Sequence, residues 1–164
     1  MQNIELTQAR LKEVLIYFKT TGQFKWRVRQ GTAKAGEIAG SNARGYLRIH
    51  IDGRDYFAHR LAWLYVHGHM PPFLLDHKNH NKADNRIGNL RLATKAQNAQ
   101  NTRSILTKSR SGLIGAAWSS QLGKWLSRIR IDGKKIYLGV FTTPEKAHAA
   151  YLVAKRKYHS FNTL

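Results

Sequence analysis

The chain has 164 residues, and its 28 lysines and arginines against 9 aspartates and glutamates give a formal net charge of +19. This length suits one domain or two small ones. So large a positive excess opposes compaction unless a polyanion neutralises it, so we expect nucleic acid as the partner. The absence of cysteine excludes disulfides, a thiol nucleophile and a zinc–thiolate site.

An anionic membrane is the alternative partner for so basic a chain. No apolar run approaches the roughly 20 residues that are needed to span a bilayer. The first residues also lack the basic and apolar regions of a signal peptide. Together with the lack of cysteine, these features predict a cytoplasmic protein without a membrane partner.

The N-terminal part predicts a helix, a strand and a β-hairpin in chain order. Apolar residues at helical spacing run from Thr7, a candidate N-cap, to Gly22, which would end the helix. Residues 24–29 alternate apolar and basic side chains, as a half-buried strand does. Residues 45–58 predict two strands joined by a tight Asp-Gly turn. An apolar helical face follows over residues 59–65.

The next stretch concentrates the polar groups of a catalytic site. Asp76 and His77 are adjacent on a predicted strand, so their side chains point to opposite faces. One can bind a metal ion while the other faces an attacking water. A capping-box pattern starts a helix at Thr94, which puts Asn98 at the end of its first turn, within reach of Asp76. Such an oxygen pair suits one Mg²⁺ or Mn²⁺ ion.

This arrangement of Asp76, His77 and Asn98 predicts a site that hydrolyses a phosphodiester bond. His77 would be the general base, since an unperturbed imidazole is largely neutral near pH 7. The metal would stabilise the charge on the pentacovalent phosphate and on the departing 3′ oxygen. Asn89 could hold either the imidazole or the adjoining loop through its amide. His59, which precedes the stretch, is expected to be a structural hydrogen-bonding residue.

Residues 75–98 have the sequence LDHKNHNKADNRIGNLRLATKAQN and follow an HRLAW segment at 59–63. Both stretches resemble the HNH endonucleases of the phage homing type. The resemblance implies a ββα-metal motif over about residues 74–104, with His77, Asn89 and Asn98 in the three positions that name it. It also implies that His77 activates water, Asp76 and Asn98 bind one divalent cation, and Asn89 braces the motif.

Residues 112–164 predict a separate small module of three strands and a helix that opens at Thr143. Strand alternation puts basic residues on one face, and Trp118 is expected to join this face. The module resembles the ethylene-response-factor (APETALA) DNA-binding domain, which implies a sheet laid in the DNA major groove. The chain has Trp118, Ser120, Leu122 and Arg128 where that family has other residues, so base specificity does not transfer. The alternative is a sheet whose outer face is merely solvated.

The combined prediction is an α+β protein with an HNH endonuclease domain over 1–99, a basic linker over 100–111 and a DNA-binding domain over 112–164. The predicted catalytic residues are His77 and Asn89, and the predicted metal ligands are Asp76 and Asn98. The residues predicted to bind DNA are Arg86, Arg91, Lys108, Arg110, Trp118, Lys124, Arg128, Arg130, Lys135 and Tyr137.

The predicted activity is metal-dependent cleavage of double-stranded DNA. One active site per chain would nick one strand, so we expect a monomer on DNA, and a double-strand break would need a dimer or two binding events. The HNH resemblance also implies a phage-encoded protein that acts in the bacterial cell. The alternatives are a non-catalytic DNA-binding regulator that keeps the fold, and an RNA-directed or structure-specific nuclease.

Overall fold

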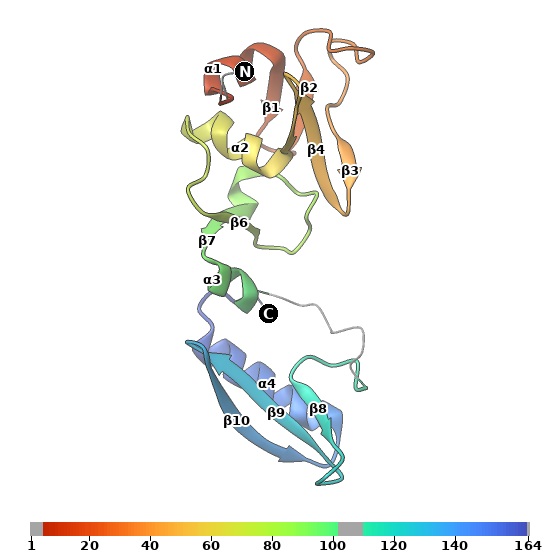
Figure 1. The fold of residues 1–164 in the computed structure, drawn as a ribbon, viewed down its shortest axis with the longest axis vertical. Helices are drawn as coiled ribbons and strands as arrows, with labels where there is room; N and C mark the ends of the chain where they lie inside the picture. Colours follow the sequence, from red (N-terminus) through yellow and green to blue (C-terminus); the bar gives the residue numbers. More distant parts are fainter. Residues whose placement is uncertain (1–4, 102–109, 164) are drawn as a thin grey trace. The chain divides into compact units, whose positions relative to one another are not determined.

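The structure is a computed structural model that describes residues 5–101 and 110–163. The chain divides into two compact units, Met1–Thr94 and Lys95–Leu164. Both units are built from small antiparallel sheets with helices packed against them (Figure 1), which confirms the predicted α+β class. Among the described residues, no helix combines the length and the apolar character that a bilayer crossing requires.

Over residues 5–94 the first unit contains three sheets, with strand orders β1-β2, β3-β4-β5 and β6-β7. Helix α2 contacts α1, β4, β5 and the short 3-10 helix η1, so it links the N-terminal sheets to the last hairpin. The elements in chain order are α1 (Gln8–Val14), β1 (Leu15–Phe18), β2 (Gln23–Trp26), β3 (Ser41–Ala43), β4 (Tyr46–Ile51), β5 (Arg54–Phe57), α2 (Ala58–His67), β6 (Leu74–His77), η1 (Ile87–Asn89) and β7 (Leu90–Ala93).

The first predicted helix is much shorter than expected. Thr7 caps α1 by accepting a hydrogen bond from the backbone of Arg10, as predicted, but the helix ends at Val14. The next four residues form β1, which pairs with β2 and buries Leu15 and Tyr17. Gly22 therefore closes a strand turn and does not end a helix. The aromatic and β-branched residues of this segment favour a strand once a partner strand is available.

The predicted β-hairpin is confirmed as β4 and β5. Asp52 and Gly53 have φ angles of 49° and 78°. Two successive positive φ angles are typical of the type I′ turn, whose twist matches that of the flanking strands. Helix α2 follows directly and ends at Gly68, which adopts the left-handed conformation with φ 84°.

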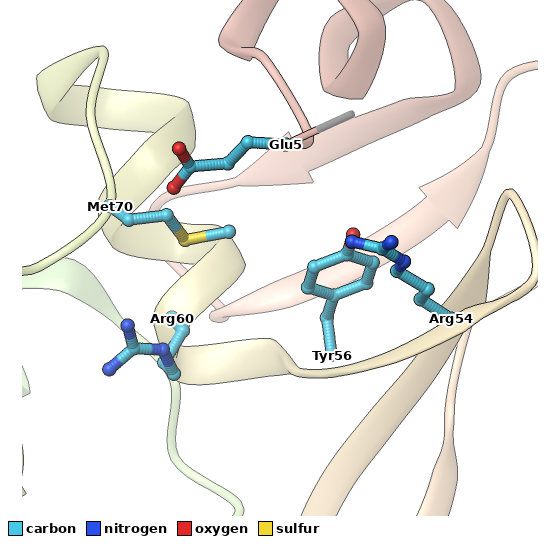
Figure 2. Close-up of a pocket in the computed structure, with 5 residues that line it drawn as sticks. All are labelled: Glu5, Arg54, Tyr56, Arg60 and Met70. Carbon is cyan, nitrogen blue, oxygen red and sulfur yellow. The ribbon is translucent and has the colours of Figure 1, made fainter. Parts of the chain in front are cut away.

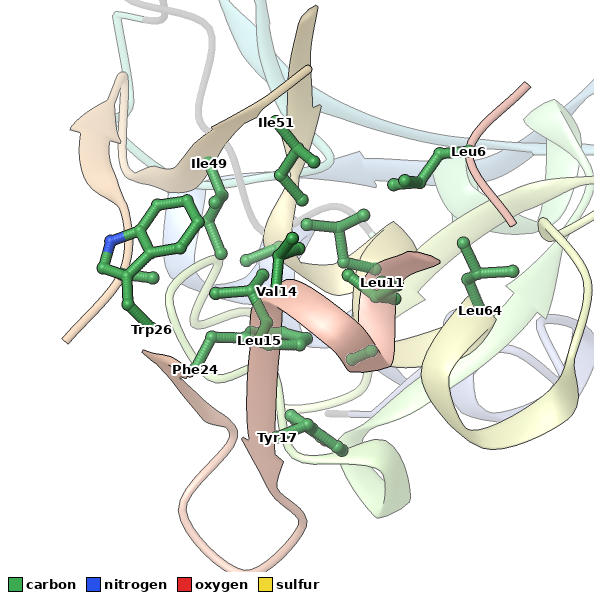
Figure 3. Packing of buried hydrophobic residues seen from close by; sticks show 14 of the residues in the cluster. Leu6, Leu11, Val14, Leu15, Tyr17, Phe24, Trp26, Ile49, Ile51 and Leu64 are labelled. Carbon is green, nitrogen blue, oxygen red and sulfur yellow. The ribbon is translucent and has the colours of Figure 1, made fainter. Parts of the chain in front are cut away.

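The core of the first unit lies between α1, β1, β2, β4 and α2 (Figure 3). Leu11, Leu15 and Ile51 have no exposed surface. Leu90, the first residue of β7, belongs to the same core cluster. The β6–β7 hairpin, which carries the predicted catalytic residues, is therefore anchored to the scaffold by apolar packing.

The second unit is a three-stranded sheet, in the order β10-β9-β8, with one long helix against it. Thr143 caps this helix by accepting a hydrogen bond from the backbone of Lys146, and Pro144 is its first residue, as predicted. Ala147 and Ala154 are buried, so small side chains let the helix lie close to the sheet. The elements are α3 (Lys95–Gln100), β8 (Ala116–Ser119), β9 (Lys124–Ile131), β10 (Lys134–Phe141) and α4 (Pro144–Tyr158).

Candidate active site

The β6–β7 hairpin places Asp76 opposite Arg91 and His77 opposite Leu90. Asp76 and His77 are 7% and 5% exposed. Charged and titratable side chains are rarely this buried without specific partners. The surrounding elements therefore shield this adjacent pair from most solvent contact.

Asp76 is held by a charged partner on the neighbouring strand. Nε of Arg91 donates to Oδ2 of Asp76 at 2.9 Å, and Nη2 forms an ion pair with the same oxygen at 2.8 Å. A paired, hydrogen-bonded carboxylate tolerates burial because the guanidinium offsets its lost hydration. Arg91 was predicted to bind DNA, and in the structure it contacts this carboxylate.

The imidazole of His77 lies in an aromatic pocket. Its ring centroid is 5.2 Å from that of His59, edge to face, and 6.0 Å from that of Tyr46. Oδ1 of Asn85 lies 3.5 Å from Nε2 of His77. Burial lowers the pKa of His77 below its ordinary value of 6.5, although the contact with Asn85 and nearby acids act in the opposite direction. The ring is therefore neutral near pH 7 and able to accept a proton.

Asn89 braces the loop between the two strands. Its amide Nδ2 donates to Oδ1 of Asn79 at 3.0 Å and to the backbone oxygen of Asp84 at 2.8 Å. Its Oδ1 accepts from the backbone N–H of Asn79 at 3.1 Å. The sequence left open whether Asn89 holds the imidazole or the loop, and these hydrogen bonds show that it holds the loop. The amide that contacts the imidazole belongs to Asn85.

Asn85, Tyr46 and Tyr17 lie around His77 and are not among the site residues predicted from the sequence. Asn85 is 1% exposed, and its Nδ2 donates to the backbone oxygen of Ala83. The hydroxyl of Tyr17 donates to the backbone oxygen of Asn85 at 2.7 Å. Tyr17 is distant in the sequence, and no local pattern marks it. Asn85 lies inside the stretch that resembles the HNH motif, and this location is the feature of the sequence that could have identified it as a site residue.

His59 contributes packing to this cluster. It is 8% exposed and stacks on Phe57 with ring centroids 5.5 Å apart. Burial, then the neighbouring His77 and Arg60, lower its pKa to about 4. Its Nδ1 has no hydrogen-bond partner within residues 5–101 and 110–163. The expectation that His59 is a structural hydrogen-bonding residue is therefore wrong for Nδ1. Ring contacts hold the side chain in place instead.

The donor set is compatible with one hard divalent cation. Nowhere in the described part of the chain do three or more His, Cys, Asp or Glu side chains gather as a metal site. Mg²⁺ is commonly held by one or two carboxylates together with water and substrate phosphates, so Asp76 suits it. Asn98 lies on α3, which begins at Lys95 directly after Thr94 as predicted. Because α3 belongs to the second unit, a shared site for Asn98 and Asp76 stays a prediction.

The β9–β10 face of the second unit is basic and exposed, as predicted. The strand register pairs Arg130 with Lys135 and Arg128 with Tyr137, so these four side chains share one face. On the opposite face Ser127 and Ile129 are buried. Lys124 is an even number of residues from Arg128 and Arg130 on β9, so it lies on the same face, and it is also exposed.

Trp118 does not belong to this basic face. The register pairs it with Trp125, and the two rings lie 5.2 Å apart. Directly paired residues of antiparallel strands share a face, so Trp118 lies on the side opposite Arg128. The guanidinium of Arg110 stacks on its ring at 4.9 Å. Lys108, also predicted to bind DNA, lies outside the described residues.

A pocket of about 380 Å³ lies beside the start of α2 in the first unit (Figure 2). Its lining mixes two arginines with one acid, and none of the predicted catalytic or metal-binding residues takes part. The pocket is therefore separate from the Asp76–His77 pair. The lining residues are Glu5, Arg54, Tyr56, Arg60 and Met70.

Residues 56–100 match the HNH endonuclease family. The HNH resemblance is thereby confirmed for this stretch, which we call the HNH region and which includes Asp76, His77, Asn89 and Asn98. No curated protein matches the chain.

Among solved structures, the chain is similar to one titled "DNA binding and cleavage by the HNH homing endonuclease I-HmuI". The sequences are 21% identical and the TM-score is 0.41, over 88% of this chain and 80% of that chain.

Proposed function

We propose that the protein is a metal-dependent endonuclease that hydrolyses phosphodiester bonds in double-stranded DNA. The observation that carries this proposal is the buried imidazole of His77 next to Asp76, on the β6–β7 hairpin of the HNH region. A general base needs a pKa near or below the working pH and a fixed orientation. The ring contacts with Tyr46 and His59 supply that orientation.

In this mechanism His77 accepts a proton from the water that attacks phosphorus. The bond from phosphorus to the 3′ oxygen breaks, and the departing 3′ oxygen takes a proton from solvent. Oδ1 of Asn85 faces Nε2 of His77. This contact favours the tautomer with a proton on Nε2, since the partner of one ring nitrogen sets the state of the other. Nδ1 would then take the proton from water. Asn89 keeps the loop in place throughout.

Asp76 would hold the divalent cation together with Asn98, and Mg²⁺ or Mn²⁺ fits these oxygen ligands. A cation at this position supplies positive charge to stabilise the transferring phosphate. Arg91 orients the carboxylate of Asp76 through a hydrogen bond and an ion pair to the same oxygen.

The second unit would supply affinity and site choice through its basic sheet face, in the manner of the ethylene-response-factor domain. Arginine and lysine neutralise phosphates, and arginine reads guanine in the major groove. The proposed DNA contacts of this face are Lys124, Arg128, Arg130, Lys135 and Tyr137. One site per chain predicts a nick in one strand by a monomer.

A comparison of substrates tests this function against its alternatives. We expect the purified protein with Mg²⁺ or Mn²⁺ to cleave duplex DNA faster than single-stranded DNA or RNA of the same sequence. Preferential cleavage of RNA or of branched DNA would replace the proposed substrate. Binding to duplex DNA without cleavage, on plasmid and on genomic DNA alike, would instead indicate a regulator that keeps the fold.

A further inference from the structure

The HNH region contains several basic side chains close to the candidate site, and most of them are engaged by the protein itself. Arg91 binds Asp76, and Nζ of Lys78 donates to the backbone oxygen of Gly88 at 2.8 Å. Arg86 makes two charged hydrogen bonds to Asp84, which lower the pKa of Asp84 to about 2. These groups stabilise the loop, so they are poorly placed to give up their partners to DNA.

Lys82 differs from these residues. It is exposed, and within the described chain its ammonium group has no carboxylate or hydrogen-bond partner. Its Nζ lies 4.9 Å from the ring centroid of Tyr46. A cation over an aromatic face keeps its charge available to a second partner, because the ring carries no net charge.

The position of Lys82 connects it to the catalytic candidate. The ring of Tyr46 that lies under Nζ also contacts the rings of His77 and His59, at 6.0 and 5.5 Å. The stem of Lys82 passes over the β3–β4 turn, where a methyl group on Gly45 would lie 3.7 Å from Cδ. One aromatic ring therefore separates the free ammonium group from the proposed general base.

We propose that Lys82, held over Tyr46, binds a non-bridging phosphate oxygen of the DNA strand at or next to the bond that is cleaved. This inference rests on the proposed endonuclease function and identifies the residue that positions the strand at the site. A phosphate bound there would lie within reach of His77, and its charge would replace the missing carboxylate partner of Lys82. The loop braced by Asn89 would thus serve to present one cation.

The test uses the full chain with two substitutions that separate charge from shape. Lys82→Gln keeps most of the stem and removes the charge, and Lys82→Arg keeps the charge. The matched control is Lys12→Ala, because Lys12 is exposed in the same unit and lies over Tyr65 at 5.4 Å. The probes are a supercoiled plasmid with Mn²⁺ for cleavage, and a labelled 30-base-pair duplex in EDTA for binding.

For Lys82→Gln we expect at least about tenfold slower cleavage, the scale of one lost charge-assisted contact. The slope of log binding constant against log salt should fall by about 0.9, since one phosphate contact is lost. Lys82→Arg should recover most of the cleavage rate and most of the salt slope. Lys12→Ala should match the wild type in both measurements.

Equal behaviour of Lys82→Gln and Lys12→Ala would overturn the inference. A cleavage defect that arginine does not rescue, with an unchanged salt slope, would show a structural role and overturn it too. If the wild type does not cleave any substrate, the endonuclease proposal fails, while the salt slope in EDTA still decides whether Lys82 contacts DNA.

Discussion

Replacement of His77 by alanine should lower the rate of DNA cleavage by about 10²- to 10⁴-fold, the usual contribution of a positioned general base. DNA binding should remain, because the basic surfaces that we propose as phosphate contacts do not include the imidazole. The cleavage rate of the wild type should also fall in acid, with a midpoint below pH 6.5, because burial lowers the pKa of His77 and protonation removes the base.

The measurement is single-turnover cleavage with bound duplex, so that binding and chemistry are read separately. His69→Ala is the matched control, since His69 is an exposed histidine whose Nδ1 contacts the backbone oxygen of Met70. It should cleave like the wild type. A His77→Ala protein that folds, binds and cleaves at the wild-type rate would show that another group activates the water.

Replacement of Gly22 by alanine should destabilise the first unit by about 2–5 kcal/mol, from backbone strain and a steric clash together. Gly22 has φ 75°, and a Cβ there would lie 2.4 Å from the backbone N of Arg86 and 2.7 Å from the carbonyl carbon of Asn85. Backbone atoms cannot move aside as a flexible side chain does. The turn would separate from the loop that holds Asn85 against His77, so cleavage should fall as well.

Gly53→Ala is the control for this prediction. Gly53 has a similar φ of 78°, but a Cβ there would meet nothing within 4 Å. Its cost should be limited to the left-handed backbone, about 1–2 kcal/mol. The two variants are compared by the midpoint of urea unfolding, which reports a change in stability where the slope is unchanged. Equal losses would mean that the contact between the two loops contributes nothing.

The parts of the fold that the sequence predicts correctly are those with strong local signals. The Asp52-Gly53 turn demands positive φ angles, and the Thr143-Pro144 start specifies a helix N-terminus. The helix prediction for Leu15–Phe18 is wrong because the apolar spacing of this segment fits a helix as well as a strand. Pairing with β2 makes it a strand. Tertiary context overrides such short ambiguous segments.

The candidate site also combines features that follow from local sequence with features that depend on the folded structure. The Asp76–His77 pair and the loop-bracing role of Asn89 follow from residues close together in the sequence. The contact from Tyr17 to Asn85 joins residues far apart in the chain, so only folding brings them together. The ion pair between Arg91 and Asp76 depends on the cross-strand register of β6 and β7. The face of Trp118 likewise follows from its pairing with Trp125.

The most direct test of the central claim is incubation of the purified protein with supercoiled plasmid in Mg²⁺, in Mn²⁺ and in EDTA. The proposed function predicts conversion to open circles with a divalent cation, no conversion in EDTA, and loss of the activity in the His77→Ala variant. Cleavage in EDTA, or metal-dependent cleavage that survives the loss of His77, would contradict an HNH site built on Asp76 and His77.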